Sequence, residues 1–173
     1  MKPYKPETRE EELRFFRHAM AQIPTSVAVV AVGRASGLWR GATVGSFGVI
    51  SWDPAIVGFW LHSSTGMHAL LTQAEGLPIG VSVLAAHQED LAVHFAGGSQ
   101  LKTVSPDAYH DRVVFEGSVL QIAGTYAGNR VDVEDHTLFL LAPEVFRWTQ
   151  DHTLPLLYWQ RSYLRLPTEP QGG

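Results

Sequence analysis

The sequence contains no cysteine, which excludes disulfide bonds and cysteine-ligated zinc or iron–sulfur sites. It lacks an apolar run of the about 18 residues that a transmembrane helix needs, and its N-terminus, MKPYKPETREEELRFF, is charged where a signal peptide is apolar. It also lacks an excess of basic residues, because its net charge is −4. These absences predict a cytoplasmic protein that binds neither membranes nor nucleic acids.

Familiar catalytic motifs are missing as well. The chain has no G-x-S-x-G elbow, no Walker loop and no G-x-G-x-x-G after a predicted strand. Its eight histidines include no H-E-x-x-H or H-x-H pair, so we predict no metal site and interpret them as partly exposed side chains.

The residues that are present indicate one globular domain. Of the 173 residues, 45% are hydrophobic and 17% are charged. We interpret residues 1–9 as a tail, 10–166 as the domain and 167–173 as a disordered C-terminal tail. Hydrophobic spacing predicts helices over 10–22, 65–73 and 87–95. Strands are predicted over 27–32, 39–46, 48–51, 55–61, 77–85, 112–115, 118–126, 136–147 and 156–165.

The stretches 98–111 and 124–136 are rich in turn residues and are interpreted as loops. Many short strands with few short helices predict a mainly β barrel.

Clusters of small polar residues stand at the edges of these strands. They are 43–47 (TVGSF), 63–65 (SST), 82–84 (SVL) with Gln88, and 134–136 (EDH). Taken singly, each cluster has an ordinary structural explanation: a strand end, a helix N-cap, a buried strand or a turn. The backbone N–H groups at a helix start also bind anions, so the segment 63–65 is compatible with either role.

In order along the chain, IPTSVAVV, GATVGSFGVISWDPAIVGFWL, SVLAAHQEDLAVHFA, DHTLFLLAPEV and LPLLYWQRSYLRL resemble the flavin reductase-like family from about Phe15 to Leu166. The resemblance implies a split β-barrel that binds FMN, of Greek-key type with about six to eight strands. It implies a homodimer with flavin at the subunit interface. It also implies an NAD(P)H:flavin oxidoreductase that passes hydride from nicotinamide C4 to the N5 atom of FMN or FAD. The reduced flavin then serves a separate monooxygenase.

The resemblance also assigns site residues. Thr43, Val44, Gly45 and Ser46 lie along the isoalloxazine ring. The phosphate is assigned to Ser63, Ser64 and Thr65 with Lys102. The pyrimidine edge is assigned to Ser82, Val83 and Leu84 with Gln88 nearby. His136 is the catalytic residue, placed beside the nicotinamide and the reacting flavin face.

Three positions depart from the family pattern: Gly45 and Glu134 stand where relatives carry Ser and Gly, and Ser82 replaces an Asn. These departures leave two alternatives open. One is a flavin-binding carrier or sensor without reductase turnover. The other is a split barrel that binds haem or another ligand.

Overall fold

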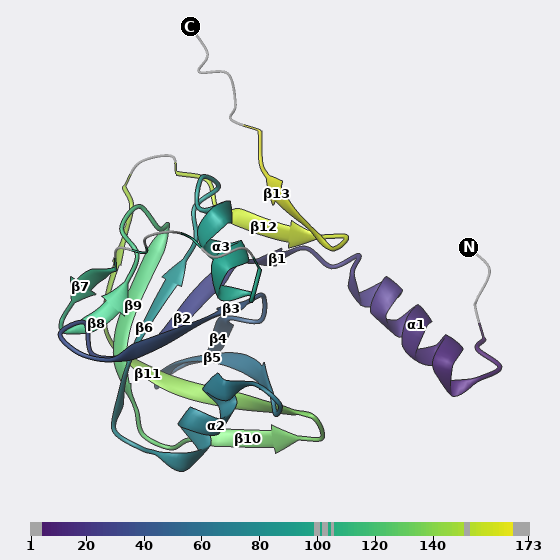
Figure 1. Ribbon diagram of the computed structural model, residues 1–173, viewed down its shortest axis with the longest axis horizontal. Helices are drawn as coiled ribbons and strands as arrows, with labels where there is room; N and C mark the ends of the chain where they lie inside the picture. The colour runs from purple at the N-terminus through teal and green to yellow at the C-terminus, as the bar shows by residue number, and fades with distance from the viewer. Residues whose placement is uncertain (1–4, 99–100, 102–103, 105, 151–152, 168–173) are drawn as a thin grey trace, which may run out of the picture.

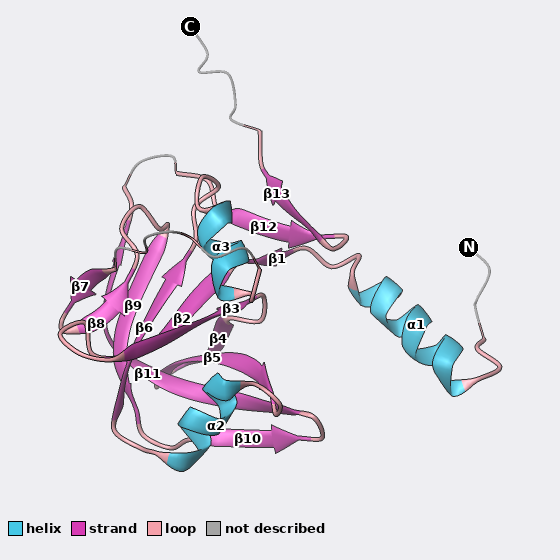
Figure 2. Ribbon diagram, in the orientation of Figure 1, coloured by secondary structure: helices cyan, strands magenta, loops and turns pink. Residues whose placement is uncertain are grey.

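The computed structural model describes residues 5–98, 101, 104, 106–150 and 153–167. Its helices are α1 (Arg9–Met20), α2 (Gly66–Gln73) and α3 (Glu89–Phe95) (Figure 2). Its strands are β1 (Thr25–Ser26), β2 (Ala28–Gly33), β3 (Trp39–Val44), β4 (Gly48–Trp52), β5 (Ala55–His62), β6 (Leu77–Val83), β7 (Asp107–Tyr109), β8 (Arg112–Val114), β9 (Leu120–Tyr126), β10 (Arg130–Val133), β11 (His136–Trp148), β12 (Leu156–Trp159) and β13 (Ser162–Arg165).

The main sheet has eight strands in the order β3-β2-β6-β9-β11-β5-β4, with β10 paired to β11, and it curls into a half-barrel (Figure 1). Every strand pair in it is antiparallel. Strand β11 is long enough to pair with three strands. Its first half pairs with β5 and β10, and its second half pairs with β9, with a register shift between Pro143 and Val145. The predicted mainly β barrel with a few short helices is confirmed.

Strand β2 is buried on both faces, which explains its continuous apolar sequence. Its alternate residues Ala28, Val30 and Val32 face the barrel core, where Met67 and Leu71 of α2 close the interior. The intervening residues Val29 and Ala31, with the preceding Val27, face a second core. Helix α3 and strand β8 cover that core through Ala92, Val113 and Phe115.

Three hairpins correct the sequence interpretation. Residues 107–109 and 130–133, expected in loops, form strands β7 and β10, and the single strand expected over 156–165 is the hairpin β12–β13. Their turns place non-glycine residues at positive φ: His110 and Asp111 (50° and 59°), Glu134 (49°), and Gln160 and Arg161 (49° and 65°). None of these three turns contains the Asn-Gly pair by which such hairpins are often recognised in a sequence.

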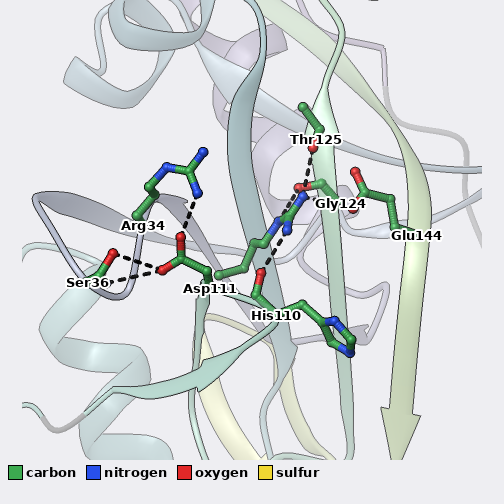
Figure 3. A network of polar contacts seen from close by, with 8 residues as sticks. Arg34, Ser36, His110, Asp111, Gly124, Thr125 and Glu144 are labelled. Atoms are coloured by element: carbon green, nitrogen blue, oxygen red, sulfur yellow. Dashed lines mark hydrogen bonds and ion pairs between the residues drawn. The ribbon is translucent and has the colours of Figure 1, made fainter.

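Polar contacts anchor the β7–β8 turn to the barrel (Figure 3). The Asp111 carboxylate accepts hydrogen bonds from Arg34 Nη1 at 2.6 Å and Ser36 Oγ at 3.0 Å. The next residue, Arg112, donates to the Gly124 carbonyl, to Thr125 Oγ1 and, at 2.8 Å, to Glu144 Oε2. The turn is thus held from both sides, which compensates for its left-handed backbone.

The hydrogen bond from Arg34 keeps the pKa of Asp111 below its ordinary value of 3.8. A lowered folded-state pKa adds stability that is complete above the unfolded pKa and is lost as pH falls through the folded pKa. Asp111→Asn, which tolerates the left-handed backbone, should therefore lower the urea midpoint at pH 7. The gap between variant and wild type should close below pH 3.8. A gap that stays constant with pH would contradict the pairing.

Helix α1 begins at a capped turn, in which Thr8 Oγ1 accepts from the Glu11 N–H at 3.2 Å. The residues that end it bind the turn of the β12–β13 hairpin, since the Gln160 N–H donates to the Ala21 carbonyl, and the helix itself extends away from the barrel (Figure 1). None of its residues is buried. Its apolar positions Leu13, Phe16 and Met20 are exposed, although they recur at helical spacing. Among the described helices, none has the length and apolar character that crossing a membrane requires.

Candidate functional site

The end of β3 and the exposed residues that follow it, Gly45 and Ser46, are held by their neighbours. Thr43 Oγ1 donates to the Ala92 carbonyl of α3 at 2.7 Å, and Val44 is buried. Ser46 Oγ accepts from the Trp60 N–H at 3.0 Å and lies 3.3 Å from the Trp60 carbonyl, which joins this segment to β5. Between them, Gly45 is exposed and has one close neighbour. A Cβ added there would come within 4 Å only of Thr25, at 3.0 Å from its Oγ1.

Three exposed hydroxyl residues, Ser63 to Thr65, form the turn between β5 and α2. Thr65 is the N-cap, and its Oγ1 accepts from the His68 N–H at 3.2 Å. The first backbone N–H groups of a helix have no partner within the helix, and the helix dipole makes this end positive. The sequence predicted both an N-cap and an anion site here, and this geometry suits the two together.

Arg40 of β3 lies at the same turn, although the sequence interpretation did not assign it. Its Nη1 is 3.7 Å from the position that a Cβ on Gly66 would occupy. No acidic side chain among the described residues forms an ion pair with Arg40, and the side chain is exposed. Lys102, the cation that the sequence predicted for this place, lies outside the described residues. The sequence offered one signal for Arg40: it begins the segment RGATV and so lies close to Thr43, the first residue of the predicted cluster 43–47.

His136 begins β11 and is exposed, with its Nδ1 2.7 Å from Asp135 Oδ1. This hydrogen bond holds the pKa of Asp135 below its ordinary value. The other oxygen, Asp135 Oδ2, lies 3.7 Å from Nε2 of His62 at the end of β5. His136 and the Ser63–Thr65 turn are therefore neighbours, as the predicted site requires.

The remaining predicted residues lie at the end of β6 and, for Gln88, at the start of α3. Ser82 is buried, and its Oγ accepts from the Phe115 N–H at 3.0 Å, while Leu84 is fully buried and Val83 half-buried. Gln88 binds the protein's own backbone, since its Oε1 accepts from the Ala85 N–H and its Nε2 donates to the Glu116 carbonyl. In this group Val83 and Gln88 are therefore the half-buried residues, and the Gln88 side chain is engaged with the protein itself.

The surface around Gly45 and Ser64 is open rather than enclosed. Two surface hollows, of about 280 and 170 Å³, lie elsewhere, one beside Asn129 and Arg130 and the other beside Glu116 and Arg147. Within the part of the chain that the structure describes, no three His, Cys, Asp or Glu side chains gather as metal ligands. The geometry is thus an exposed surface with hydroxyls, a helix start, an arginine and a histidine–carboxylate pair.

Comparisons with known proteins identify the family of the chain. The sequence model of one protein family, the flavin reductase like domain, matches residues 20–167. The NADH-dependent FMN reductase AsuE2 of Streptomyces nodosus subsp. asukaensis is 30% identical over 158 residues, which are 87% of this chain and 83% of that protein.

Solved structures match over nearly the whole chain. The NADH:FAD oxidoreductase SgcE6 of Streptomyces globisporus C-1027 superposes with a TM-score of 0.81 at 26% identity, covering 100% of this chain and 98% of that one. The styrene monooxygenase flavin reductase SMOB of Pseudomonas putida S12 gives 0.76 at 31% identity, covering 90% and 99%. The resemblance seen in the sequence motifs is confirmed, and the chain belongs to the flavin reductase like family.

Proposed function

We propose that this protein is an NADH-dependent flavin reductase that supplies reduced FMN or FAD to a partner oxygenase. The observation that carries the proposal is the junction of an anion-binding turn, Ser63–Thr65 with Arg40, and the Asp135–His136 pair. The names of the relatives support NADH as the electron donor and FMN or FAD as the acceptor. The name of SMOB, a styrene monooxygenase flavin reductase, supports a monooxygenase as the partner.

The described residues fit a flavin. The Ser63 hydroxyl, the start of α2 and the Arg40 guanidinium are donors suited to its phosphate, whereas the Ser64 hydroxyl contacts Nδ1 of His62. The open surface at Gly45 leaves room for a flat ring beside backbone N–H groups, and half-buried Val83 is assigned to the pyrimidine edge of the ring. A bound flavin supplies the chemistry by accepting hydride from the nicotinamide. The protein's part is to bind, to orient and to exclude water.

Two exposed surfaces support a dimer. Helix α1 presents Leu13, Phe16 and Met20 to solvent, a cost that a second subunit would remove. The residues assigned to the flavin, among them Gly45 and Ser63 to Thr65, are also exposed on one subunit, whereas cofactor sites usually enclose their ligand. We therefore propose a homodimer whose partner subunit covers both, and sedimentation of the purified protein measures its mass directly.

Spectroscopic assays test the function. The purified protein should oxidise NADH at 340 nm only when FMN or FAD is added, and it should use NADPH more slowly. Flavin binding without NADH oxidation would instead identify a carrier or sensor, and a Soret band on adding haem would identify a haem protein.

Replacing His136 should separate turnover from binding. We expect His136→Ala to lower kcat for NADH oxidation at saturating flavin by about tenfold, because the nicotinamide loses an orienting contact. The Kd for FMN should change by less than about twofold, since the phosphate turn is untouched. Equal losses in kcat and in FMN affinity would count against this assignment.

A further inference from the structure

We propose that His62 is a positioning residue that links the phosphate-binding turn to His136 through Asp135. The two ends of the site, one assigned to the flavin phosphate and the other to the nicotinamide, would then be aligned by one chain of polar contacts, in which the step from His62 to Asp135 is 3.7 Å and the step from Asp135 to His136 is a 2.7 Å hydrogen bond. This inference rests on the proposed function and assigns a role to a histidine that the sequence motifs left without one.

Strand pairing brings the two histidines together. In the β5–β11 register His62 is directly opposite His136, so both side chains stand on the same face. Their ring centroids are 5.0 Å apart in an edge-to-face arrangement. The Asp135 carboxylate lies between them, with Oδ1 2.7 Å from Nδ1 of His136 and Oδ2 3.7 Å from Nε2 of His62.

The other ring nitrogen of His62 contacts the phosphate turn. The Ser64 N–H donates to Nδ1 of His62 at 3.1 Å, and Ser64 Oγ lies 2.8 Å from the same atom. A backbone N–H can only donate, so Nδ1 carries the lone pair and the proton of the neutral ring is on Nε2, toward Asp135. Each nitrogen of His62 therefore serves a different end of the site.

Independent contacts keep the two segments in place. The Ser63 N–H donates to the Asp135 carbonyl at 2.9 Å. Nε2 of His68 on α2 lies 2.9 Å from Oγ1 of the buried Thr137, which donates to Asp132 at 2.7 Å. Because these bonds do not involve His62, replacing it should re-aim side chains without separating α2 from the β10–β11 hairpin.

Two replacements of His62 each remove one of its two contacts and keep the other. In His62→Asn, the amide oxygen takes the place of Nδ1 and can still accept from Ser64, but no atom reaches Asp135. In His62→Gln, the amide lies near the place of Nε2 and can still donate to Asp135, but the acceptor for Ser64 is lost.

We expect one variant to weaken FMN binding and the other to lower kcat. His62→Gln should raise the Kd for FMN about fivefold, with kcat at saturating flavin changed less than about twofold. His62→Asn should lower kcat about fivefold, with the Kd for FMN changed less than about twofold. Stopped-flow NADH oxidation and FMN fluorescence titration measure the two quantities. Equal effects of both variants on both quantities, or no effect of either, would overturn the positioning role.

His110 provides a matched control. It is an exposed histidine in the β7–β8 turn, and His110→Asn and His110→Gln should leave the Kd and kcat at wild-type values. Amide spectra separate this inference from the proposed function, because they need no turnover. Both variants remove the ring current of His62, so the size of each shift is compared: the Ser64 amide signal should shift more in His62→Gln than in His62→Asn, while the Asp135 and His136 signals should shift more in His62→Asn. The reverse pattern overturns the inference even if the wild type reduces flavin, and the expected pattern supports it even if the wild type does not.

Discussion

Gly80→Ala should unfold or severely destabilise this protein, by about 3 kcal/mol or more. A Cβ on Gly80 would lie 1.9 Å from the Val113 carbonyl oxygen and 2.8 Å from its carbon, both backbone atoms of β8. Strand β6 cannot retreat, because Gly80 is paired with Ala31 on one side and Ala123 on the other. The added methyl group must therefore displace β8 from the outer core. Urea denaturation followed by circular dichroism measures the loss.

A second glycine serves as the control for this experiment. Gly37 lies in the turn between β2 and β3, where an added Cβ meets nothing within 4 Å. Gly37→Ala should stay within about 0.5 kcal/mol of the wild type. If Gly80→Ala were equally well tolerated, β8 could not lie against β6 as described here.

Gly45→Phe should abolish flavin binding and leave the fold intact. The only nearby atoms that a Cβ on Gly45 meets belong to the Thr25 side chain, which can shift by a few tenths of an ångström. The phenyl group would instead fill the exposed space assigned to the isoalloxazine ring. Loss of that stacking surface should raise the Kd for FMN by about a hundredfold, which corresponds to about 2.8 kcal/mol. Fluorescence titration with FMN measures the change.

The control for Gly45→Phe is Gly37→Phe, which adds the same ring at another open position on the surface. Both variants should unfold at nearly the wild-type urea concentration, and only Gly45→Phe should lose FMN. An unchanged FMN affinity in Gly45→Phe would place the ring elsewhere and leave the family assignment standing.

Several features could be predicted from the sequence because their signals are local. The uninterrupted apolar run 27–32 predicted strand β2, and burial on both faces explains it. Thr65 predicted the start of α2, since an N-cap depends on neighbouring residues only. The order of the motifs predicted the family, which the match over residues 20–167 confirms.

The hairpins could not be predicted, because their signals are not local. Non-glycine residues occupy the positive-φ positions at His110, Asp111, Glu134, Gln160 and Arg161. Left-handed backbone at such residues costs free energy that distant contacts must offset, as Arg34 does for Asp111. Turn composition therefore indicated loops where tertiary contacts support strands.

For the site as well, the residue types could be predicted from the sequence and their arrangement in space could not. The sequence by itself determined the polar types at the strand ends, the glycine that leaves space and the histidine at the start of β11. Tertiary structure decided which of them meet. It enclosed Ser82 beneath β8, brought Arg40 to the start of α2 and placed His62 opposite His136. The physical reason is that strand register and packing depend on the burial of the whole core, which no short stretch of sequence encodes.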